Sequence, residues 1–184
     1  MGKLIMWNLI TIDGFFEGKE KWELDWHEYA WGEELEQLSL EQLKSADMLI
    51  FGSVTYTGMA NYWSTAEGEI ANLMNNIPKV VISDSPINAG WNNTKIISNN
   101  VVEEIKKLKE QSIKDIYIFG SAILCDTLIK NNLFDEYRIC IAPVILGEGT
   151  HLFKSQSNRL RMELLWSKTL KTGAVILCYK PISA

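Results

Sequence analysis

The chain has 184 residues, 47% of them hydrophobic and 22% charged, which is enough to bury the core of a soluble globular domain. With four prolines and twelve glycines it is not a low-complexity chain, and no stretch approaches the roughly 18 apolar residues of a membrane span. The formal net charge of -5 and the dispersed lysines argue against a nucleic-acid surface. We therefore expect one domain over residues 1–184, with neither a membrane nor a nucleic acid as partner.

The first quarter of the chain predicts a strand, a loop and a helix. The apolar run Lys3–Ile12 is typical of a strand that ends at the turn Asp13-Gly14. Phe15–His27 is rich in Trp, Glu and Gly and predicts a loop. Glu28–Ser45 has apolar positions at helical spacing and predicts an amphipathic helix. The wholly apolar run Met48–Phe51 then fits a strand that is buried on both faces.

The middle of the chain repeats this alternation of short apolar strands and helices. Strands are expected at Lys79–Ser83, Lys95–Ser98 and Asp115–Phe119, and helices at Thr55–Tyr62, Ala66–Asn76, Val101–Gln111 and Ile123–Asn131. Asn99 or Asn100 is placed to cap the third of these helices. Because strands that alternate with helices are joined by crossovers, the sheet is expected to be largely parallel.

The end of the chain predicts antiparallel strands instead of alternating strands and helices. Arg161–Thr169 and Ala174–Lys180 face each other across a turn at 171–173 and predict a hairpin. Glu136–Pro143 is grouped with them, so that all three segments form an antiparallel addition at one edge of the sheet.

The cysteines and histidines limit which kinds of site the chain can form. Cys125, Cys140 and Cys178 are far apart and lie in apolar runs, which favours reduced core thiols and a cytoplasmic location. His27 and His151 are the only histidines, so we expect no metal site. The chain also lacks the Gly-Lys-Ser/Thr phosphate loop and the Gly-x-Gly-x-x-Gly fingerprint.

Three predicted strand ends are small and polar: Gly52–Thr55, Ser83–Ser85 and Gly120–Ala122. In an open parallel sheet, ligands bind beyond the carboxyl ends of the strands, where the N-termini of helices offer unpaired N–H groups. One such turn has a purely steric explanation. Three in the same sheet favour a nucleotide.

The order of these segments resembles the dihydrofolate-reductase superfamily. The residues that carry the resemblance are Ile12-Asp13-Gly14-Phe15, Met48 to Tyr56, Pro78 to Ser83, Ile118 to Ala122, Asp135 to Arg138, Pro143 to Gly149 and Leu152-Phe153. The later motifs are similar to the reductase domain of the bifunctional riboflavin-biosynthesis deaminase/reductase. The resemblance implies an α/β fold of three layers, with a mixed, mostly parallel sheet of about eight strands and an antiparallel C-terminal edge hairpin.

The resemblance also implies NADPH along the carboxyl edge of the sheet and hydride transfer to a small heterocycle. The cofactor-binding residues that it implies are Leu9, Phe16, Gly52, Ser53, Val54, Thr55, Ser83, Asp84, Ser85, Phe119, Gly120, Ser121, Ala122, Ile123 and Leu124. Two departures matter: Ser53 and Val54 stand where the family often has Arg or His, and Asp84 puts a carboxylate where a 2′-phosphate needs a cation. NADH therefore remains possible.

The substrate is expected to lie against the first strand and the loop after it. Trp7, Trp22 and Trp26 can sandwich a planar ring, although Trp22 and Trp26 can equally close the loop over the core. A carboxylate there would assist protonation of the ring, and Asp25 is our candidate. Asp13 is the rival, but Asp before Gly is also common in turns for local hydrogen bonding.

Two functions follow from the sequence. The first is a nicotinamide-dependent reductase of a small pterin- or pyrimidine-like compound. The second is a non-catalytic ligand-binding or assembly module on the same fold, suggested by Ser53 and Asp84. The C-terminal hairpin offers an apolar face, and members of the family commonly associate through this side, so a homodimer is expected.

Overall fold

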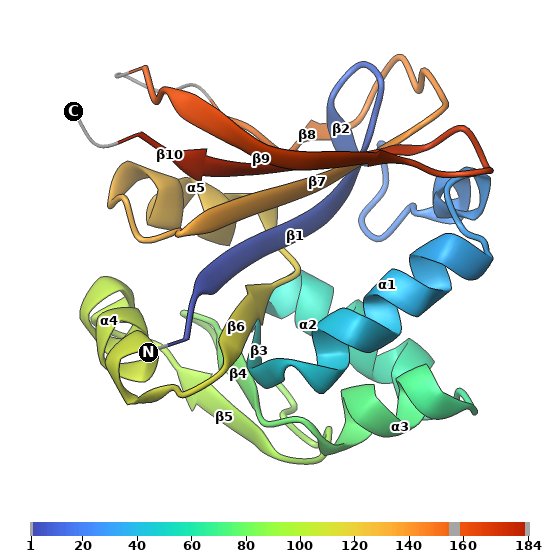
Figure 1. Cartoon of the computed structure of the whole chain (residues 1–184). Helices are drawn as coiled ribbons and strands as arrows, with labels where there is room; N and C mark the ends of the chain where they lie inside the picture. The colour runs from blue at the N-terminus through green and yellow to red at the C-terminus, as the bar shows by residue number, and fades with distance from the viewer. Residues whose placement is uncertain (1, 155–158, 183–184) are drawn as a thin grey trace.

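The computed structural model describes residues 2–154 and 159–182. Its strands are β1 (Leu4–Thr11), β2 (Phe15–Glu17), β3 (Ala46–Gly52), β4 (Lys79–Ile82), β5 (Thr94–Ile97), β6 (Asp115–Ile118), β7 (Glu136–Ala142), β8 (Thr150–His151), β9 (Met162–Thr169) and β10 (Val175–Pro181). Its helices are the 3-10 helix η1 (Asp25–Tyr29), α1 (Glu33–Lys44), α2 (Ser53–Trp63), α3 (Glu69–Asn76), α4 (Val101–Gln111) and α5 (Ala122–Lys130). Figure 1 shows their arrangement.

The main sheet has eight strands in the order β5-β4-β3-β6-β1-β7-β10-β9. The strands from β5 to β7 are mutually parallel, and β10 and β9 add antiparallel strands at one edge. Strands β2 and β8 form a separate two-stranded sheet. The predicted α/β class, strand number and C-terminal edge hairpin are confirmed.

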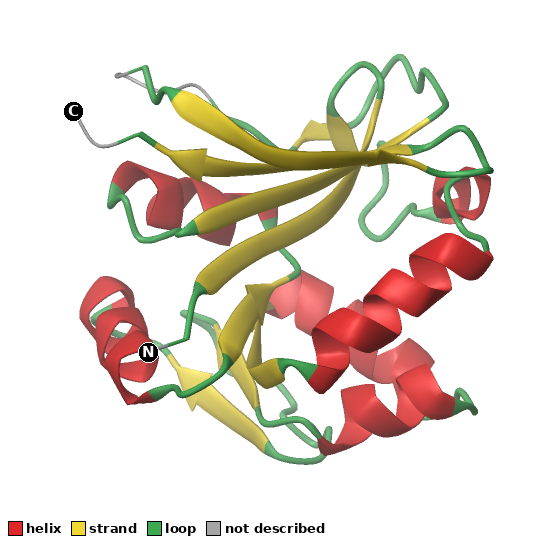
Figure 2. Cartoon of the chain, in the orientation of Figure 1, coloured by secondary structure: helices red, strands yellow, loops and turns green. Residues whose placement is uncertain are grey.

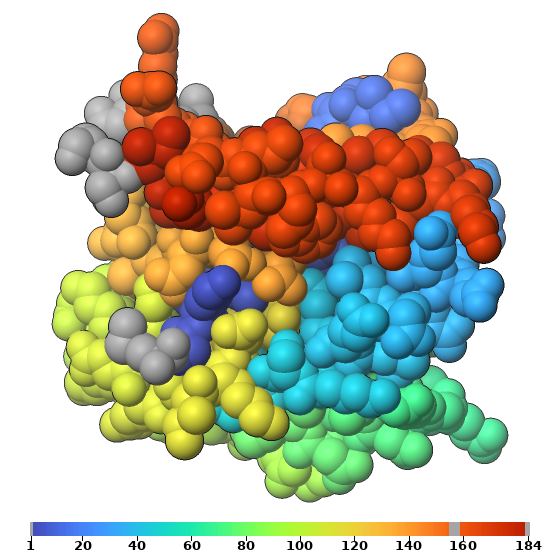
Figure 3. Space-filling view, viewed as in Figure 1, coloured from blue at the N-terminus to red at the C-terminus, as the bar shows by residue number. Residues whose placement is uncertain are grey.

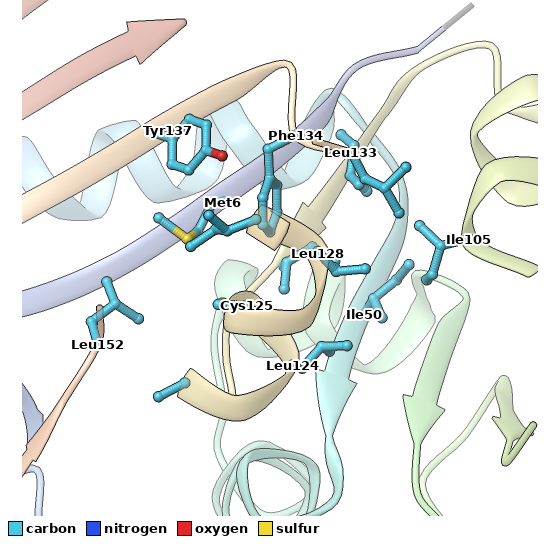
Figure 4. Close-up of a cluster of buried hydrophobic side chains, with 14 of the residues drawn as sticks. Met6, Ile50, Ile105, Leu124, Cys125, Leu128, Leu133, Phe134, Tyr137 and Leu152 are labelled. Carbon is cyan, nitrogen blue, oxygen red and sulfur yellow. The ribbon is translucent and has the colours of Figure 1, made fainter. Parts of the chain in front are cut away.

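The sheet is the middle of three layers. Helices α4 and α5 lie on one side of it, and α1, α2 and α3 lie on the other (Figures 1 and 2). Each side of the sheet has its own cluster of buried hydrophobic residues, the first under α4 and α5 and the second under α1, α2 and α3. Side chains of β1 alternate between them: Leu4 and Met6 belong to the first core cluster, and Ile5 and Trp7 to the second. Figure 4 shows α5 placing Leu128 in the first cluster.

The prediction for Glu136–Pro143 was wrong in part. Strand β7 is antiparallel to β10, as expected, but it also runs parallel to β1 from the pair Ile5↔Glu136 to the pair Thr11↔Ala142. Because the chain reaches β7 from β6 through the helix α5, β7 arrives in the same direction as the central strands. The antiparallel part of the sheet therefore begins one strand later.

The segment after β1 has more structure than the predicted loop at Phe15–His27. It contains β2, which pairs with β8, and it enters η1 at Asp25. Helix α1 starts at Glu33 and not at Glu28, because Trp26 and Ala30 are buried in the second core cluster and hold the preceding residues in η1. Asn100 is the N-cap of α4, but its side chain makes no capping hydrogen bond.

The three cysteines are buried and form no disulfide. Burial raises the pKa of the Cys125 and Cys140 thiols to about 12 and that of Cys178 to about 11, so all three are protonated at neutral pH. In the described ranges, no helix has the length and apolar character that crossing a membrane requires.

Leu128→Ala is expected to lower the free energy of unfolding by about 3 kcal/mol, because Leu128 is 0% exposed and its truncation leaves a cavity in the first core cluster. Urea unfolding followed by circular dichroism measures this change. The control is Ile113→Ala, since Ile113 is 86% exposed and should change the free energy by less than about 0.5 kcal/mol. Equal effects of the two substitutions would contradict the core assignment.

Candidate functional site

Four parallel strands end at the same edge of the sheet. In the register of the sheet, Gly52 pairs with Ile82, Ile82 with Ile97, and Ile50 with Ile118. The turns that follow β3, β4 and β6 are therefore neighbours. This is the convergence that the three small polar strand ends predicted.

The ends of β3 and β6 touch through their backbones. The amide of Gly52 donates a hydrogen bond to the carbonyl of Gly120 at 3.0 Å. A Cβ atom on Gly52 would clash with Ser121 Oγ, and one on Gly120, whose φ is +103°, would lie 2.6 Å from Phe16 Cζ. Both positions therefore need glycine, and Gly120 needs it for its backbone conformation as well.

This contact brings two helix N-termini together. Helix α2 begins directly after Gly52 and has no side-chain cap. Helix α5 begins directly after Ser121, whose Oγ accepts a hydrogen bond from the amide of Leu124 at 3.4 Å. Helix N-termini carry partial positive charge and unpaired N–H groups, so the pair forms a place where an anion such as a diphosphate can bind.

The residues predicted to hold a cofactor differ in how far their side chains are exposed. Val54 and Ile123 are exposed in the first turns of α2 and α5. Ala122 and Leu124 are buried in the first core cluster, so only their backbones can face a ligand. The side chains of Leu9, Phe16, Thr55 and Phe119 line a cavity beside the helix ends.

The turn after β4 is fixed by its own hydrogen bonds. Ser83 Oγ donates to the carbonyl of Ser85 at 2.8 Å and accepts from the Ser85 amide at 3.3 Å. Asp84 is exposed next to them. The turn thus adds a carboxylate to the edge of the sheet where the helix N-termini meet.

The cavity has a volume of about 170 Å³. It lies on the side of the sheet that α1, α2 and α3 cover, and most of its wall is apolar or aromatic. The lining residues are Trp7, Asn8, Leu9, Phe16, Trp22, Leu24, His27, Trp31, Leu35, Ser39, Gln42, Leu43, Thr55, Met59, Trp63, Ile70, Met74 and Phe119. A small pocket with an apolar wall and few polar groups is typical of a site for a small organic ligand.

The three tryptophans predicted to bind substrate have different places. Trp7 and Trp22 line the cavity, whereas Trp26 is 1% exposed in the second core cluster and is not part of the wall. The indole of Trp22 packs so closely on α2 that a Cβ on Gly58 would overlap it. Trp22 therefore closes the loop onto α2 and also forms part of the cavity wall.

The two predicted catalytic carboxylates do not line the cavity. Asp25 is the exposed first residue of η1. Asp13 accepts hydrogen bonds from Thr11 Oγ1 and from the amides of Leu146 and Gly147. Desolvation acts to raise the pKa of Asp13, but these hydrogen bonds outweigh it and lower the pKa to about 2. Asp13 thus ties the turn after β1 to the segment before β8.

Sequence reasoning missed Asn8 and His27. Both residues border the cavity, and each keeps a buried polar atom without a hydrogen-bond partner: Asn8 Oδ1 and His27 Nε2. The Asn8 side chain lies on the α5 face of β1, as Met6 does, and its Nδ2 donates to Cys125 Sγ at 3.8 Å. Because both unpartnered atoms are fully buried, neither faces the open space of the cavity. One Asn in an apolar strand and one His in a loop form no motif, so only their position in the fold reveals them.

Within the described ranges, no cluster of three or more His, Cys, Asp or Glu side chains is arranged to hold a metal ion. Burial lowers the pKa of His27 to about 4, with the carboxylate of Asp25 acting weakly in the opposite direction. The imidazole is therefore neutral at pH 7.

His27 should make the protein less stable in mild acid. Between its unfolded pKa of 6.5 and its folded pKa of about 4, the unfolded chain binds a proton that the folded chain does not. The free energy of unfolding should therefore fall by about 2 kcal/mol from pH 7 to pH 5. Urea unfolding at the two pH values measures the loss. His27→Phe should abolish it and His151→Phe should retain it, and an unchanged loss in His27→Phe would contradict this assignment.

Comparison with known proteins agrees with this architecture. The sequence matches the RibD C-terminal domain family over residues 2–176. It is 31% identical over 182 residues to YyaP of Bacillus subtilis (strain 168), an uncharacterized protein, and the match covers 96% of this chain and 94% of YyaP.

Solved structures show the same fold. A crystal structure described as a riboflavin biosynthesis protein, from Shewanella sp. PV-4, has a TM-score of 0.82 and 19% identity, with 98% of this chain and 99% of that chain covered. Dihydrofolate reductase from Enterococcus faecalis, complexed with NADP(H), has a TM-score of 0.67 and 16% identity, with 99% and 98% covered. With its sequence match over residues 2–176, this chain belongs to the RibD C-terminal domain family.

Proposed function

We propose that the protein is a nicotinamide-dependent reductase that transfers a hydride to a small pterin- or pyrimidine-like heterocycle in the tryptophan-lined cavity. The observation that carries the proposal is the meeting of the α2 and α5 N-termini at Gly52 and Ser121, next to that cavity. The fold shared with a reductase that was crystallised with NADP(H) supports it.

The residues at the sheet edge fit such a cofactor. The first N–H groups of α2 and α5 would bind its diphosphate, and Gly52 and Gly120 let the two strand ends approach each other closely. When bound, a reduced nicotinamide supplies the hydride, so the protein needs no nucleophile of its own. Phe16 and Phe119, which line the cavity beside the strand ends, would exclude water from the transfer.

The choice between the two nicotinamide cofactors depends on the turn after β4. We propose NADPH as the cofactor. NADH is the alternative, because the exposed carboxylate of Asp84 lies where a cation would favour the 2′-phosphate. Proton delivery to the product is assigned to neither predicted carboxylate, because Asp25 lies outside the cavity and Asp13 is held by three hydrogen bonds.

Two observations favour a reductase over a non-catalytic binding module. Phe119 lines the cavity without filling it. Tyr56 is turned into the core, where its hydroxyl donates a hydrogen bond to Thr94 Oγ1 at 3.2 Å. Neither of these two aromatic side chains therefore fills the cavity, whereas the Trp22 loop, which would also support the module, closes onto α2 at Gly58. The module remains the second candidate because Ser53 and Asp84 depart from the residues that usually hold the adenosine phosphates.

We further propose that the protein is a cytoplasmic homodimer whose second copy covers β9. Strand β9 is the edge of the sheet, and Leu164, Leu165 and Trp166 on it are 49%, 40% and 36% exposed. In Figure 3 the atoms of this strand form a continuous part of the visible surface. An exposed apolar edge strand favours pairing with another chain.

Val54→Asp is expected to weaken NADPH binding at least tenfold, because it places a carboxylate in the first turn of α2, where the phosphates would bind. An acidic residue there also favours the helix, so loss of binding would not be due to unfolding. Titration with NADPH and NADH, followed by quenching of tryptophan fluorescence, measures the affinities.

Asn61→Asp is the matched control for this titration, since it adds the same charge two turns further along α2 and should leave the NADPH affinity within about twofold. If the unmodified protein binds neither NADPH nor NADH below millimolar concentration, the reductase proposal is wrong. If Val54→Asp binds as tightly as the unmodified protein, the helix N-termini do not hold the phosphates.

Trp166→Glu is expected to convert the dimer to a monomer, because it places a charge in the apolar part of β9. Size-exclusion chromatography with light scattering gives the mass of each form. Ile113→Glu, which adds the same charge at an exposed isoleucine outside the sheet, should remain a dimer. A monomeric unmodified protein would refute the dimer, and a dimeric Trp166→Glu would place the interface elsewhere.

A further inference from the structure

A buried arginine lies next to the cavity wall. Arg138 on β7 is the register partner of Trp7 on β1, which lines the cavity. Its side chain is 14% exposed, and that of its ion-pair partner Glu136 is 5% exposed. Arg138 Nε and Nη2 both donate to Glu136 Oε2, at 3.1 and 2.8 Å. Burial removes water from this ion pair, so the remaining N–H groups of the guanidinium need partners in the protein.

The third nitrogen of Arg138 fixes an amide in the cavity wall. Nη1 donates to Gln42 Oε1 at 3.0 Å and to the Tyr117 hydroxyl at 3.1 Å. A guanidinium only donates, so the amide of Gln42 must turn its oxygen toward Arg138. The two N–H groups of Gln42 Nε2 are therefore the part of this amide that is directed elsewhere. Gln42 is 4% exposed on α1 and lines the cavity.

Gln42 Nε2 is a donor that is left for a ligand. Within residues 2–154 and 159–182, no protein group accepts a hydrogen bond from it. It is also not one of the unpartnered polar side-chain atoms that are fully enclosed, which are Asn8 Oδ1, Trp26 Nε1 and His27 Nε2. Nε2 therefore keeps contact with open space. Ser39, one helical turn earlier in the same wall, differs because its hydroxyl already donates to the carbonyl of Leu35 at 2.8 Å.

The charges behind Gln42 make its amide a stronger donor. Glu136 also forms an ion pair with Lys3, so one carboxylate is shared by two cations and the positive charge of Arg138 is not fully cancelled. A hydrogen bond from a charged group polarises the amide that accepts it and strengthens the N–H groups on the other side. Such a donor favours an acceptor that carries partial negative charge. The rest of the wall is mostly aromatic or apolar and fits the ring that bears the acceptor.

We infer that Gln42 is a specificity-determining residue, whose Nε2 donates a hydrogen bond to an acceptor group on the substrate, and that Arg138 positions it. This inference rests on the proposed reductase function, for which it names a residue that binds substrate. Arg138 acts only through Gln42 and does not touch the ligand. Its buried ion pair with Glu136 thereby serves the cavity as well as the sheet.

Two probes that differ in one group test the role of Gln42. Acetophenone and α-methylstyrene have the same shape, but only acetophenone has a carbonyl acceptor. NMR titration of the full chain with each probe gives the ratio of the two affinities, which we call the carbonyl preference. Gln42→Met removes the amide at similar size. It should lower the carbonyl preference by about fivefold or more and leave the affinity for α-methylstyrene within about twofold.

Arg138→Lys tests the positioning role. Lysine keeps a positive charge beside Glu136 but lacks the fork that reaches Gln42 at the same time. The carbonyl preference should fall by a similar factor, while the affinity for α-methylstyrene stays within about twofold, a difference that general loss of structure would not produce. Tyr117→Phe and Ser39→Ala are the matched controls, because they leave the contact between Arg138 and Gln42 in place, and both should keep the preference.

A spectroscopic measurement on the unmodified chain needs no stable variant of Arg138. The side-chain N–H signals of Gln42 are assigned by their loss from the spectrum of Gln42→Met. Acetophenone should shift these signals, because its carbonyl accepts from Nε2, and α-methylstyrene should shift them much less. Equal shifts with the two probes would contradict a hydrogen bond from Gln42.

The outcomes separate this inference from the reductase proposal. Binding of NADPH together with an unchanged carbonyl preference in Gln42→Met overturns the inference and leaves the reductase standing, as does failure of acetophenone to bind at millimolar concentration. The expected fall in preference without binding of NADPH or NADH supports the role of Gln42 and overturns the reductase. A preference that falls in Gln42→Met but not in Arg138→Lys overturns the role of Arg138.

Discussion

The backbone contact between the ends of β3 and β6 is the constraint on which the rest of the site depends. Gly52 donates to the carbonyl of Gly120, and neither position has room for a Cβ atom. Because each glycine or its neighbour is also the residue before a helix, the same contact sets the N-termini of α2 and α5 side by side. A side chain at Gly52 would push on Ser121, and one at Gly120 would push on Phe16 and Thr55, so the packing around both helix starts depends on these two glycines.

The position of β6 explains why the cavity opens beside this contact. Strand β1 pairs with β6 only as far as Met6, yet it continues alongside β7 to Thr11. Past Met6, one edge of β1 therefore loses its neighbour, and Asn8 lies in this stretch. Ligands in open α/β sheets bind where neighbouring strands diverge in this way, because backbone and side chains there have no strand to pack against.

Local sequence was sufficient for much of this fold. Apolar runs that end in Gly or Ser located β3, β4 and β6 and their turns, because strand burial and turn chemistry are both short-range signals. It was not sufficient for β7, whose direction depends on the path of α5, or for β8, which has two residues and exists only through pairing with β2. The cavity wall was the hardest part to predict, since it gathers residues from six elements and the segments between them. Asn8 and His27 border it because of their place in the fold, which no local pattern encodes.

Helix α2 links the two parts of the site. Its N-terminus faces the sheet edge, while Thr55, Met59 and Trp63, spaced four residues apart, form one wall of the cavity. Tyr56, next to Thr55 in the sequence, binds Thr94 on the other side and holds the helix against the sheet. Because one rigid element carries both sets of groups, the helix itself would set the distance between a phosphate bound at its N-terminus, as proposed, and a ring in the cavity. Hydride transfer needs such fixed spacing, whereas binding of the ring without a cofactor does not.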